Sequence, residues 1–143
     1  MRHCKTAKRL GRTKEHRIAL RRNLIGSILI KNDMRVKTTL AKAKFIKPHL
    51  EKIISLGREK TLHNYRRALS ILQNKAAVAR LFGEIGPSFA KSGRPGGYSR
   101  ILKLATRRLG DGGKQAFVEI IKEGADEAAP KKKRKLSLKR KPK

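Results

Sequence analysis

Residues 34–57, MRVKTTLAKAKFIKPHLEKIISLG, contain a change of hydrophobic period that decides the fold. From Met34 to Thr39 apolar and polar residues alternate, which predicts a short strand with Met34, Val36 and Thr38 facing the core. After Thr39, which can act as an N-cap, apolar residues recur at helical spacing and predict a helix over about 40–56. Its expected inward residues are Ile46, Leu50, Ile53 and Ile54.

Two residues of the same stretch set limits on this helix. Pro48 has no backbone N–H and a ring that crowds the preceding turn, so we expect a kink or a restarted helix near Lys47. Gly57 is expected to be the C-cap.

A helix is also expected before this stretch, with Thr13 as its N-cap. Because Arg17 and Arg21 lie at the edge of its apolar face, we expect its first half to project from the core and its second half to pack. The apolar residues that share this face are Ile18, Leu24, Ile25, Ile28 and Leu29.

Two further helices are expected after the opening stretch. Thr61 begins one, whose predicted inward residues are Leu62, Tyr65, Leu69 and Leu72. Asn74 caps the next, which should end at Gly86-Pro87 because the residue before a proline disfavours the helical region. The predicted inward residues of this last helix are Val78, Leu81, Phe82 and Ile85.

The C-terminal part has the pattern of a β-hairpin. Residues 98–106 and 115–121 are β-like, and the glycine-rich segment 110–113 separates them. Taken together, the segments predict an α+β domain of two layers. Its expected order is an N-terminal helix, a short strand, three helices and a hairpin that joins a small mixed sheet.

The charge is large and concentrated toward the ends. The 143 residues include 39 Lys and Arg against 10 Asp and Glu, a net charge of +29. Such a balance indicates a polyanionic partner, with nucleic acid favoured over an acidic membrane surface. We expect a basic arm over 1–12, a globular domain over 13–122, and an acidic linker followed by a disordered Lys/Arg-rich tail over 123–143.

Several classes of function lack their residue patterns. His3, Cys4, His16, His49 and His63 have no metal-ligand spacing, so we expect no metal and no cofactor. No catalytic constellation is present, the glycine-rich loop 93–97 lacks the P-loop pattern, and we expect neither an enzyme nor a small-molecule substrate. No apolar run is long enough to span a membrane. A single cysteine allows no intramolecular disulfide and fits a reducing compartment.

The distribution of the basic residues indicates which kind of nucleic acid is the expected partner. A helix-turn-helix would concentrate its contacts on one recognition helix, and a base-stacking sheet would need more aromatic residues than Tyr98 and Phe117. The charge is instead spread over the arm, the strand near Lys37, the loop at Arg94 and the hairpin. This wide footprint suits a large, folded RNA such as ribosomal RNA.

The sequence also contains runs that resemble one known family. They include Met1-Arg-His3, Leu10-Gly-Arg12, Arg22-Asn-Leu24, Lys37-Thr-Thr-Leu40, Val78–Phe82 and Gly96-Gly-Tyr-Ser-Arg-Ile-Leu-Lys103. Over about residues 1–121 the chain resembles bacterial large-subunit ribosomal protein L17.

The resemblance implies a non-catalytic structural constituent of the large ribosomal subunit, with a two-layer α/β fold. Its partners would be large-subunit ribosomal RNA and neighbouring ribosomal proteins, including L32, near the polypeptide exit side. The RNA contacts that the resemblance implies are Arg2, His3, Lys5, Arg12, His16, Arg17, Arg22, Lys37, Thr38, Arg94, Tyr98 and Arg100. To these the charge pattern adds Lys8, Arg9, Arg21 and Lys103.

Two features depart from the family pattern. Cys4 stands where the family often has a basic residue, so no direct RNA contact is assigned to it. The segment 123–143 lies beyond the family core. Its run Pro130–Leu136 is similar to a nuclear import signal, but we interpret it as nonspecific electrostatic attachment to RNA.

Other functions remain open on the residues alone. A basic DNA-binding, nucleoid-type protein would share the composition, and ordinary core packing would account for Tyr98 equally well. An RNA-modifying enzyme is disfavoured because the chain lacks a cofactor motif.

Overall fold

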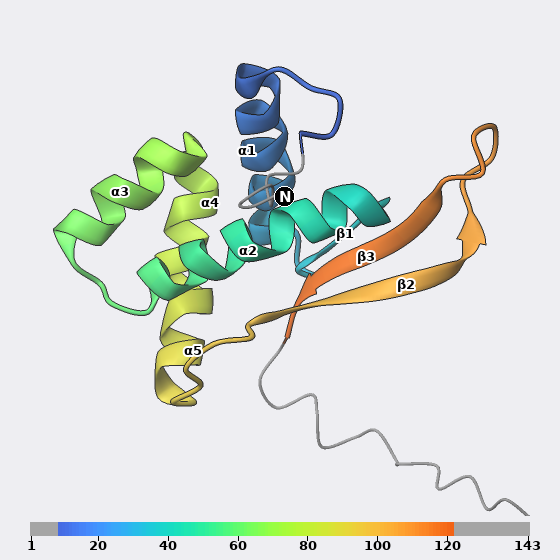
Figure 1. Ribbon diagram of the computed structural model, residues 1–143. Coiled ribbons are helices and arrows are strands. Elements are labelled where there is room, and N and C mark those ends of the chain that lie inside the picture. The colour runs from blue at the N-terminus through green and yellow to red at the C-terminus, as the bar shows by residue number, and fades with distance from the viewer. Residues whose placement is uncertain (1–8, 122–143) are drawn as a thin grey trace, which may run out of the picture.

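The computed structural model describes residues 9–121, and Figure 1 shows helices grouped on one side of a small twisted sheet. The helical elements are α1 (Lys14–Ile30), α2 (Leu40–Gly57), α3 (Leu62–Leu72), α4 (Lys75–Arg80), the π-helical turn η1 (Leu81–Ile85) and α5 (Gly86–Lys91). The strands are β1 (Arg35–Thr39), β2 (Ser99–Arg107) and β3 (Lys114–Ile120). The predicted α+β class is confirmed.

The sheet is wholly antiparallel, so the predicted mixed sheet is wrong. Its order is β1-β3-β2, with Val36 opposite Val118 on one side and Ile101 opposite Val118 on the other. The hairpin places β3 between the other two strands and antiparallel to both. β1 and β2 do run in the same direction, but they do not pair.

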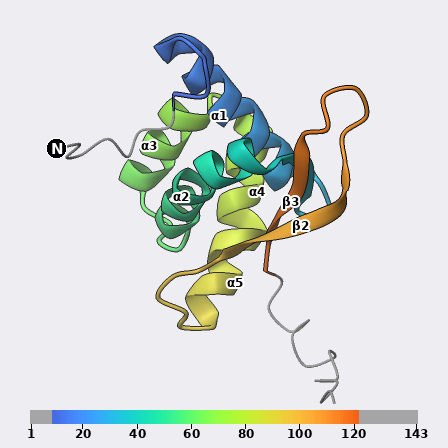
Figure 2. The ribbon, with the colours of Figure 1, turned by 45° about the vertical axis from the view of Figure 1, so that its right-hand side comes forward.

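The helix α2 packs on the inner face of this sheet and contacts all three strands. Figures 1 and 2 both show it crossing the sheet, while the tip of the hairpin extends beyond the helices. Alternation along β3 puts Ala116, Val118 and Ile120 into the core and leaves Phe117 on the outer face. The same alternation buries Val36, as predicted from the sequence.

The predicted helix starts are correct, and side chains cap three of them. Thr13 accepts from the His16 amide at 3.4 Å, Thr61 from the Asn64 amide at 3.2 Å and Asn74 from the Ala77 amide at 3.1 Å. Thr39 precedes α2 but makes no capping bond with its side chain. In α1 the fully buried residues begin at Ile25, so the first half of this helix does project from the core.

Pro48 does not restart α2, which runs unbroken from Leu40 to Gly57. Pro48 lies on the exposed side of the helix, where water can satisfy the carbonyl that loses its partner. Gly57 is the last helical residue and not a left-handed cap. A Cβ there would come within 2.8 Å of the Leu81 side chain, so its role is close packing.

The prediction that the helix after Asn74 ends at Gly86-Pro87 is wrong. The chain continues through η1 into α5, and Pro87 falls in the first turn of α5, where no intrahelical bond needs its missing N–H. Gly86 lies against the end of α2, since a Cβ there would be 1.9 Å from the Gly57 carbonyl oxygen. This continuation brings Phe89 into the core.

The inward face of α3 also differs from the prediction. Ala68 and Leu72 are buried, whereas Leu62 is 64% exposed and Tyr65 is 38% exposed. Helical spacing identified an apolar stripe, but the buried residues of α3 lie in its C-terminal half, and the helix contacts α1, α2 and α4.

Candidate nucleic-acid interface

Basic residues greatly outnumber acidic residues in the range 9–121. This range includes twenty-six Lys and Arg but seven Asp and Glu. Four of these acids form ion pairs with arginines: Asp33, Glu84, Asp111 and Glu119. Most basic residues in this part of the chain therefore have no carboxylate within ion-pair distance. A surface of this kind favours a polyanionic ligand.

The start of α1 gathers several predicted contact residues. The Arg12 amide donates to the Arg9 carbonyl at 3.1 Å, and Leu10 and Gly11 adopt positive φ in this turn. The Arg17 guanidinium donates to the Arg12 carbonyl at 2.6 Å. Arg12 and His16 are hydrogen-bonded through their side chains. These backbone and side-chain bonds hold a group of basic residues together at the exposed end of α1.

Two other predicted residues on α1 face the helical layer. The Arg22 Nε donates to the Ile71 carbonyl at 3.1 Å and so joins α1 to the last turn of α3. Arg21 points toward the space between helices, and its Nε is buried with no hydrogen-bond partner among the described residues. An unpaired buried donor of a charged group is costly, so this atom requires an explanation.

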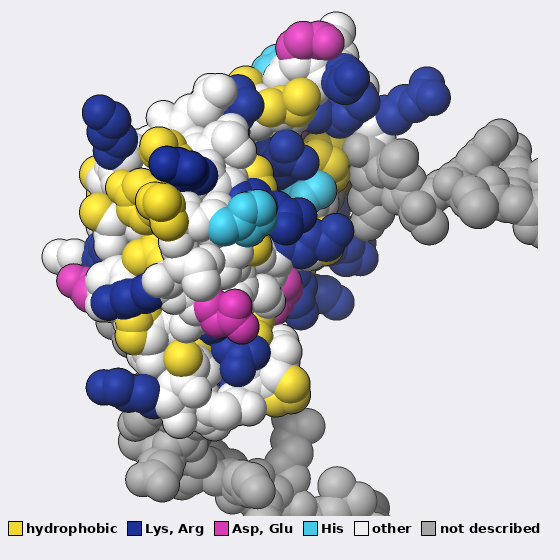
Figure 3. Space-filling view, turned by 90° about the vertical axis from the view of Figure 1, so that its left-hand side faces the viewer, with side chains coloured by type: hydrophobic (Ala, Val, Ile, Leu, Met, Phe, Trp, Pro, Cys, Tyr) yellow, Lys and Arg dark blue, Asp and Glu magenta, His cyan; other side chains and the backbone are white. Residues whose placement is uncertain are grey.

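Arg21 lines a groove of about 520 Å³ between α1, α2 and α3. We call this the helical groove and define it by its polar residues Arg21, His49, Lys52, Ser55 and Arg67 and by the apolar residues Ile53, Leu56 and Ile71. Figure 3 shows the face of the molecule that carries α3, where Lys and Arg side chains gather around histidines. Three helices thus contribute positive charge to one concave site.

The electrostatics of the groove act on His49. Burial lowers the pKa of the His49 imidazole, and the positive charges of Arg21 and Lys52 lower it further. The Phe45 ring packs edge-on against it at 5.4 Å. The groove therefore disfavours one more positive charge and would favour a negative one.

On another face of α2, a charged side chain is hydrogen-bonded by groups of the protein itself. The Glu51 carboxylate accepts from the Tyr98 and Ser99 amides, both at 2.9 Å, and from the Ser99 hydroxyl at 2.5 Å. These bonds fix the start of β2 against α2. The charge of Glu51 is therefore satisfied within the fold.

Tyr98 belongs to this structural junction and not to the surface. Its side chain is 1% exposed and its ring lies 4.9 Å from that of Phe89. Its hydroxyl donates to the Pro95 carbonyl at 3.1 Å and accepts from Arg58 at 3.2 Å. The core-packing interpretation of Tyr98 agrees with these contacts, and its ring is not presented to a ligand.

The outer face of the sheet carries a second basic region. Arg35, Glu119 and Arg100 lie in one row across the strands, and Arg100 forms an ion pair with Glu119. The Arg35 guanidinium lies 5.4 Å from the centroid of the Phe117 ring. Exposed Lys37 lies opposite Phe117 in the next row. Carboxylate and aromatic neighbours thus engage most of the charge here.

The other predicted residues are scattered around these two regions. Thr38 faces the helical layer and is half-buried, Lys103 is exposed on β2, and Arg94 lies in the loop before β2. Arg2, His3, Lys5 and Lys8 lie outside the described residues, as do the linker and tail. The structure thus brings Arg9, Arg12, His16 and Arg17 together but leaves Arg94 apart.

Sequence reasoning missed His49, Lys52 and Arg67 as members of one site. His49 and Lys52 are three residues apart, which places them on one side of a helix. That spacing is a usable signal within α2. The approach of α1 and α3 depends on tertiary packing and leaves no local trace in the sequence.

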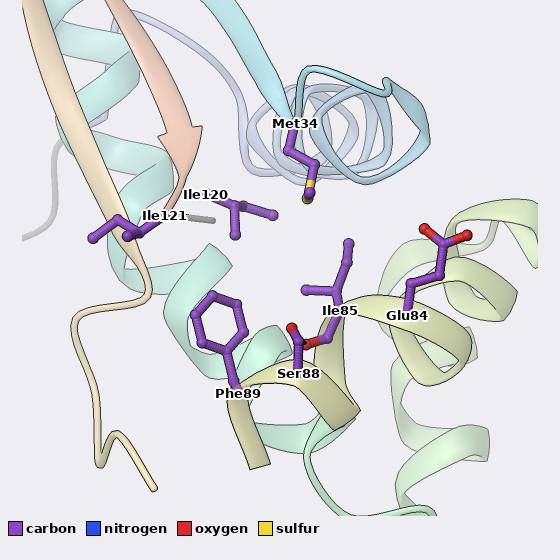
Figure 4. A pocket seen from close by; sticks show the side chains of 7 residues that line it. All are labelled: Met34, Glu84, Ile85, Ser88, Phe89, Ile120 and Ile121. Carbon is purple, nitrogen blue, oxygen red and sulfur yellow. Dashed lines mark hydrogen bonds between the residues drawn. The ribbon is translucent and has the colours of Figure 1, made fainter. Parts of the chain in front are cut away.

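A smaller hollow at the end of the sheet has a different chemistry. Figure 4 shows the side chains of Met34, Ile85, Phe89 and Ile120 pointing toward a common space of about 270 Å³. Its lining is mostly apolar and includes no basic residue. It does not resemble a site for a polyanion.

Residues 9–121 offer neither a metal-binding cluster nor a helix that could span a membrane. This range contains no cluster of three or more His, Cys, Asp or Glu side chains suited to a metal ion. None of its helices combines the length and apolarity that crossing a membrane requires.

Comparison with known proteins gives a consistent result. Residues 20–121 match the family model described as ribosomal protein L17. A large ribosomal subunit protein bL17 from Acidobacterium capsulatum is 44% identical over 135 residues, covering 94% of this chain and 80% of the relative. The protein of the same name from Chloroflexus aurantiacus is 47% identical over 121 residues, covering 85% of this chain and all of the relative. That from Carboxydothermus hydrogenoformans is 46% identical over 113 residues, covering 79% and 96%.

Proposed function

The chain belongs to the ribosomal protein L17 family, and on that premise we propose that it binds and stabilises folded ribosomal RNA as a non-catalytic constituent of the bacterial large subunit. Its place would be the cytoplasmic large ribosomal subunit, and its role would be in translation. Ribosomal RNA and neighbouring ribosomal proteins, including L32, would be its partners.

The observation that carries this proposal is the excess of positive charge that has no carboxylate partner within residues 9–121. In residues 9–121 most of the acids are engaged by ion pairs or by backbone amides, whereas most Lys and Arg are not. Phosphate groups would neutralise these charges and release counterions, which is the main source of affinity for nucleic acids. The spread of the charge over several faces supports a folded RNA and not a single duplex groove.

The proposed contact surface begins with the exposed end of α1, where Arg9, Arg12, His16 and Arg17 are held together. Residues 1–8 precede this end, and Arg2, His3, Lys5 and Lys8 would extend the contact along the RNA. Arg21 and Arg22 continue it along α1. The outer face of the sheet and its surroundings, with Lys37, Arg94, Arg100 and Lys103, would make a second set of contacts. Thr38 faces the helices and would act through its backbone.

Sedimentation of a cell lysate through a sucrose gradient tests the proposal. We expect the protein to migrate with large subunits in one-to-one stoichiometry and to remain bound in moderate salt, since integral contacts resist screening that removes loosely held basic proteins. Recovery mainly with chromosomal DNA, or release by modest salt, would favour the nucleoid-type alternative. Treatment of the lysate with DNase distinguishes the two, because only DNA-bound protein changes position.

A further inference from the structure

We propose that the helical groove binds one phosphodiester of the RNA backbone, with Arg21, Lys52 and Arg67 around the phosphate and the apolar lining residues against the adjoining sugar. The inference rests on the proposed function, because it names a specific site within the RNA interface. It adds three residues, His49, Lys52 and Arg67, that sequence reasoning did not assign.

The first argument is the unsatisfied donor. The Arg21 Nε is buried without a hydrogen-bond partner in residues 9–121. Nearly all buried polar atoms in native proteins have a partner. The Nε itself is enclosed by protein atoms, so a phosphate oxygen in the groove would accept from the terminal nitrogens of the same guanidinium, in the short, charge-assisted bonds that arginine makes to phosphate.

The second argument is the convergence of charge. Arg21 comes from α1, Lys52 from α2 and Arg67 from α3, and all three line the same groove. No carboxylate lies within ion-pair distance of any of them in the described part of the chain. Like charges that converge without a counterion destabilise a fold, so an anionic ligand would offset their repulsion.

The third argument is the size and the mixed lining of the groove. Its volume of about 520 Å³ lies within the usual range for ligand sites. Ile53, Leu56 and Ile71 supply apolar surface beside the cations. A nucleotide unit has both characters, because its phosphate is anionic and its sugar presents carbon atoms.

The fourth argument is continuity with the exposed end of α1. Arg17 and Arg21 are four residues apart and therefore lie on one face of the helix. A polynucleotide that contacts the exposed end of α1 can continue along this face into the groove. A free anion would need no such path, and this favours a phosphodiester within a chain.

The test compares two double variants of equal charge. Lys52→Gln with Arg67→Gln removes two cations from the groove, and Lys60→Gln with Arg66→Gln removes two exposed cations nearby that do not line it. Each full-length protein is titrated with protein-free large-subunit ribosomal RNA from a bacterium at several KCl concentrations. Thermal unfolding of both variants verifies that they remain folded at the temperature of the titration.

We expect the groove variant to bind about tenfold more weakly and to lose about one unit of salt dependence, since one phosphate contact is removed. The control variant should lose less than about threefold, an effect of general screening. Equal losses in the two variants, or no loss in the groove variant, would overturn the inference while leaving the proposed function intact. The proposed function itself would fail if the unaltered protein bound ribosomal RNA no more tightly than duplex DNA.

Discussion

Two faces of α2 treat their charged residues in opposite ways. Glu51 faces the start of β2, and its carboxylate accepts three hydrogen bonds from Tyr98 and Ser99. His49 and Lys52 face α1 and α3, where they meet further cations and no carboxylate among the described residues. The charge of Glu51 is fully hydrogen-bonded within the protein and so helps to hold α2 against β2. Charge that is left unsatisfied costs stability and is better explained by a ligand.

The largest effect should come from moving α2 itself, which disturbs both faces together. In Gly86→Ala the new Cβ would lie 1.9 Å from the Gly57 carbonyl oxygen, a contact that only backbone displacement can relieve. We expect a loss of at least about 3 kcal/mol in the free energy of unfolding, measured by urea denaturation.

Gly83→Ala is the matched control for this change. Gly83 lies in the adjoining turn η1, and a Cβ there would meet nothing within 4 Å. Its unfolding free energy should change by less than about 1 kcal/mol. Alanine has the higher helix propensity, so propensity alone predicts no loss at either position. Equal losses at the two positions would therefore mean that the close approach of α2 and α5 is not what requires the glycine at 86.

The next effect tests the satisfied face. Glu51→Gln keeps the size of the side chain but replaces an acceptor oxygen by a donor opposite backbone amides. We expect a loss of about 2–3 kcal/mol in the free energy of unfolding. Glu59→Gln, an exposed position near the end of α2, should change it by less than about 0.5 kcal/mol. A small loss at Glu51 would show that its charge is not the element that joins α2 to β2.

A smaller effect concerns Tyr98, which the resemblance implied as an RNA contact. Tyr98→Phe removes the hydroxyl that joins Pro95 and Arg58, and we expect a loss of about 1–2 kcal/mol in unfolding free energy. The affinity of the folded variant for ribosomal RNA should stay unchanged, because the side chain is 1% exposed. Tyr65→Phe, on the surface of α3, serves as the control. A weakened RNA affinity of folded Tyr98→Phe would restore a binding role.

The elements that were predictable are those with a local cause. Helix starts could be predicted at Thr13, Thr61 and Asn74 because each capping side chain accepts a hydrogen bond from the amide only three residues later. The alternation around Val36 and along 115–121 likewise locates strands before any partner is known.

The features that failed depend on distant residues. Gly86-Pro87 has the pattern of a helix end. In the structure Gly86 packs against Gly57, and the turn η1 continues directly into α5. The central position of β3 follows from pairing with β1, a segment about eighty residues earlier in the chain. The same limit applies to the candidate site, because Arg67 joins Arg21 only through the packing of α3 on α1.

The smallest effect should be the pH dependence contributed by His49. Its pKa is lowered in the folded state by burial and by Arg21 and Lys52, while Arg67 lines the same groove. In the unfolded chain the imidazole takes up its proton near its ordinary pKa of about 6.5. The unfolded state therefore binds more protons in the window below that value. The contribution of His49 to stability is complete above the window and is lost as the pH falls through it.

Urea denaturation across about pH 5 to 7.5 measures this dependence. His49→Gln should have a flatter profile than the unaltered protein, and His63→Gln, at the exposed start of α3, should retain the original slope. A phosphate in the groove would stabilise the imidazolium, so ribosomal RNA should raise the pKa of His49 in an NMR titration. If the pKa of His49 did not change in saturating RNA, no phosphate would lie beside it in the groove. The difference between the His49 and Glu51 faces of α2 would then be a property of the fold and would not indicate a ligand.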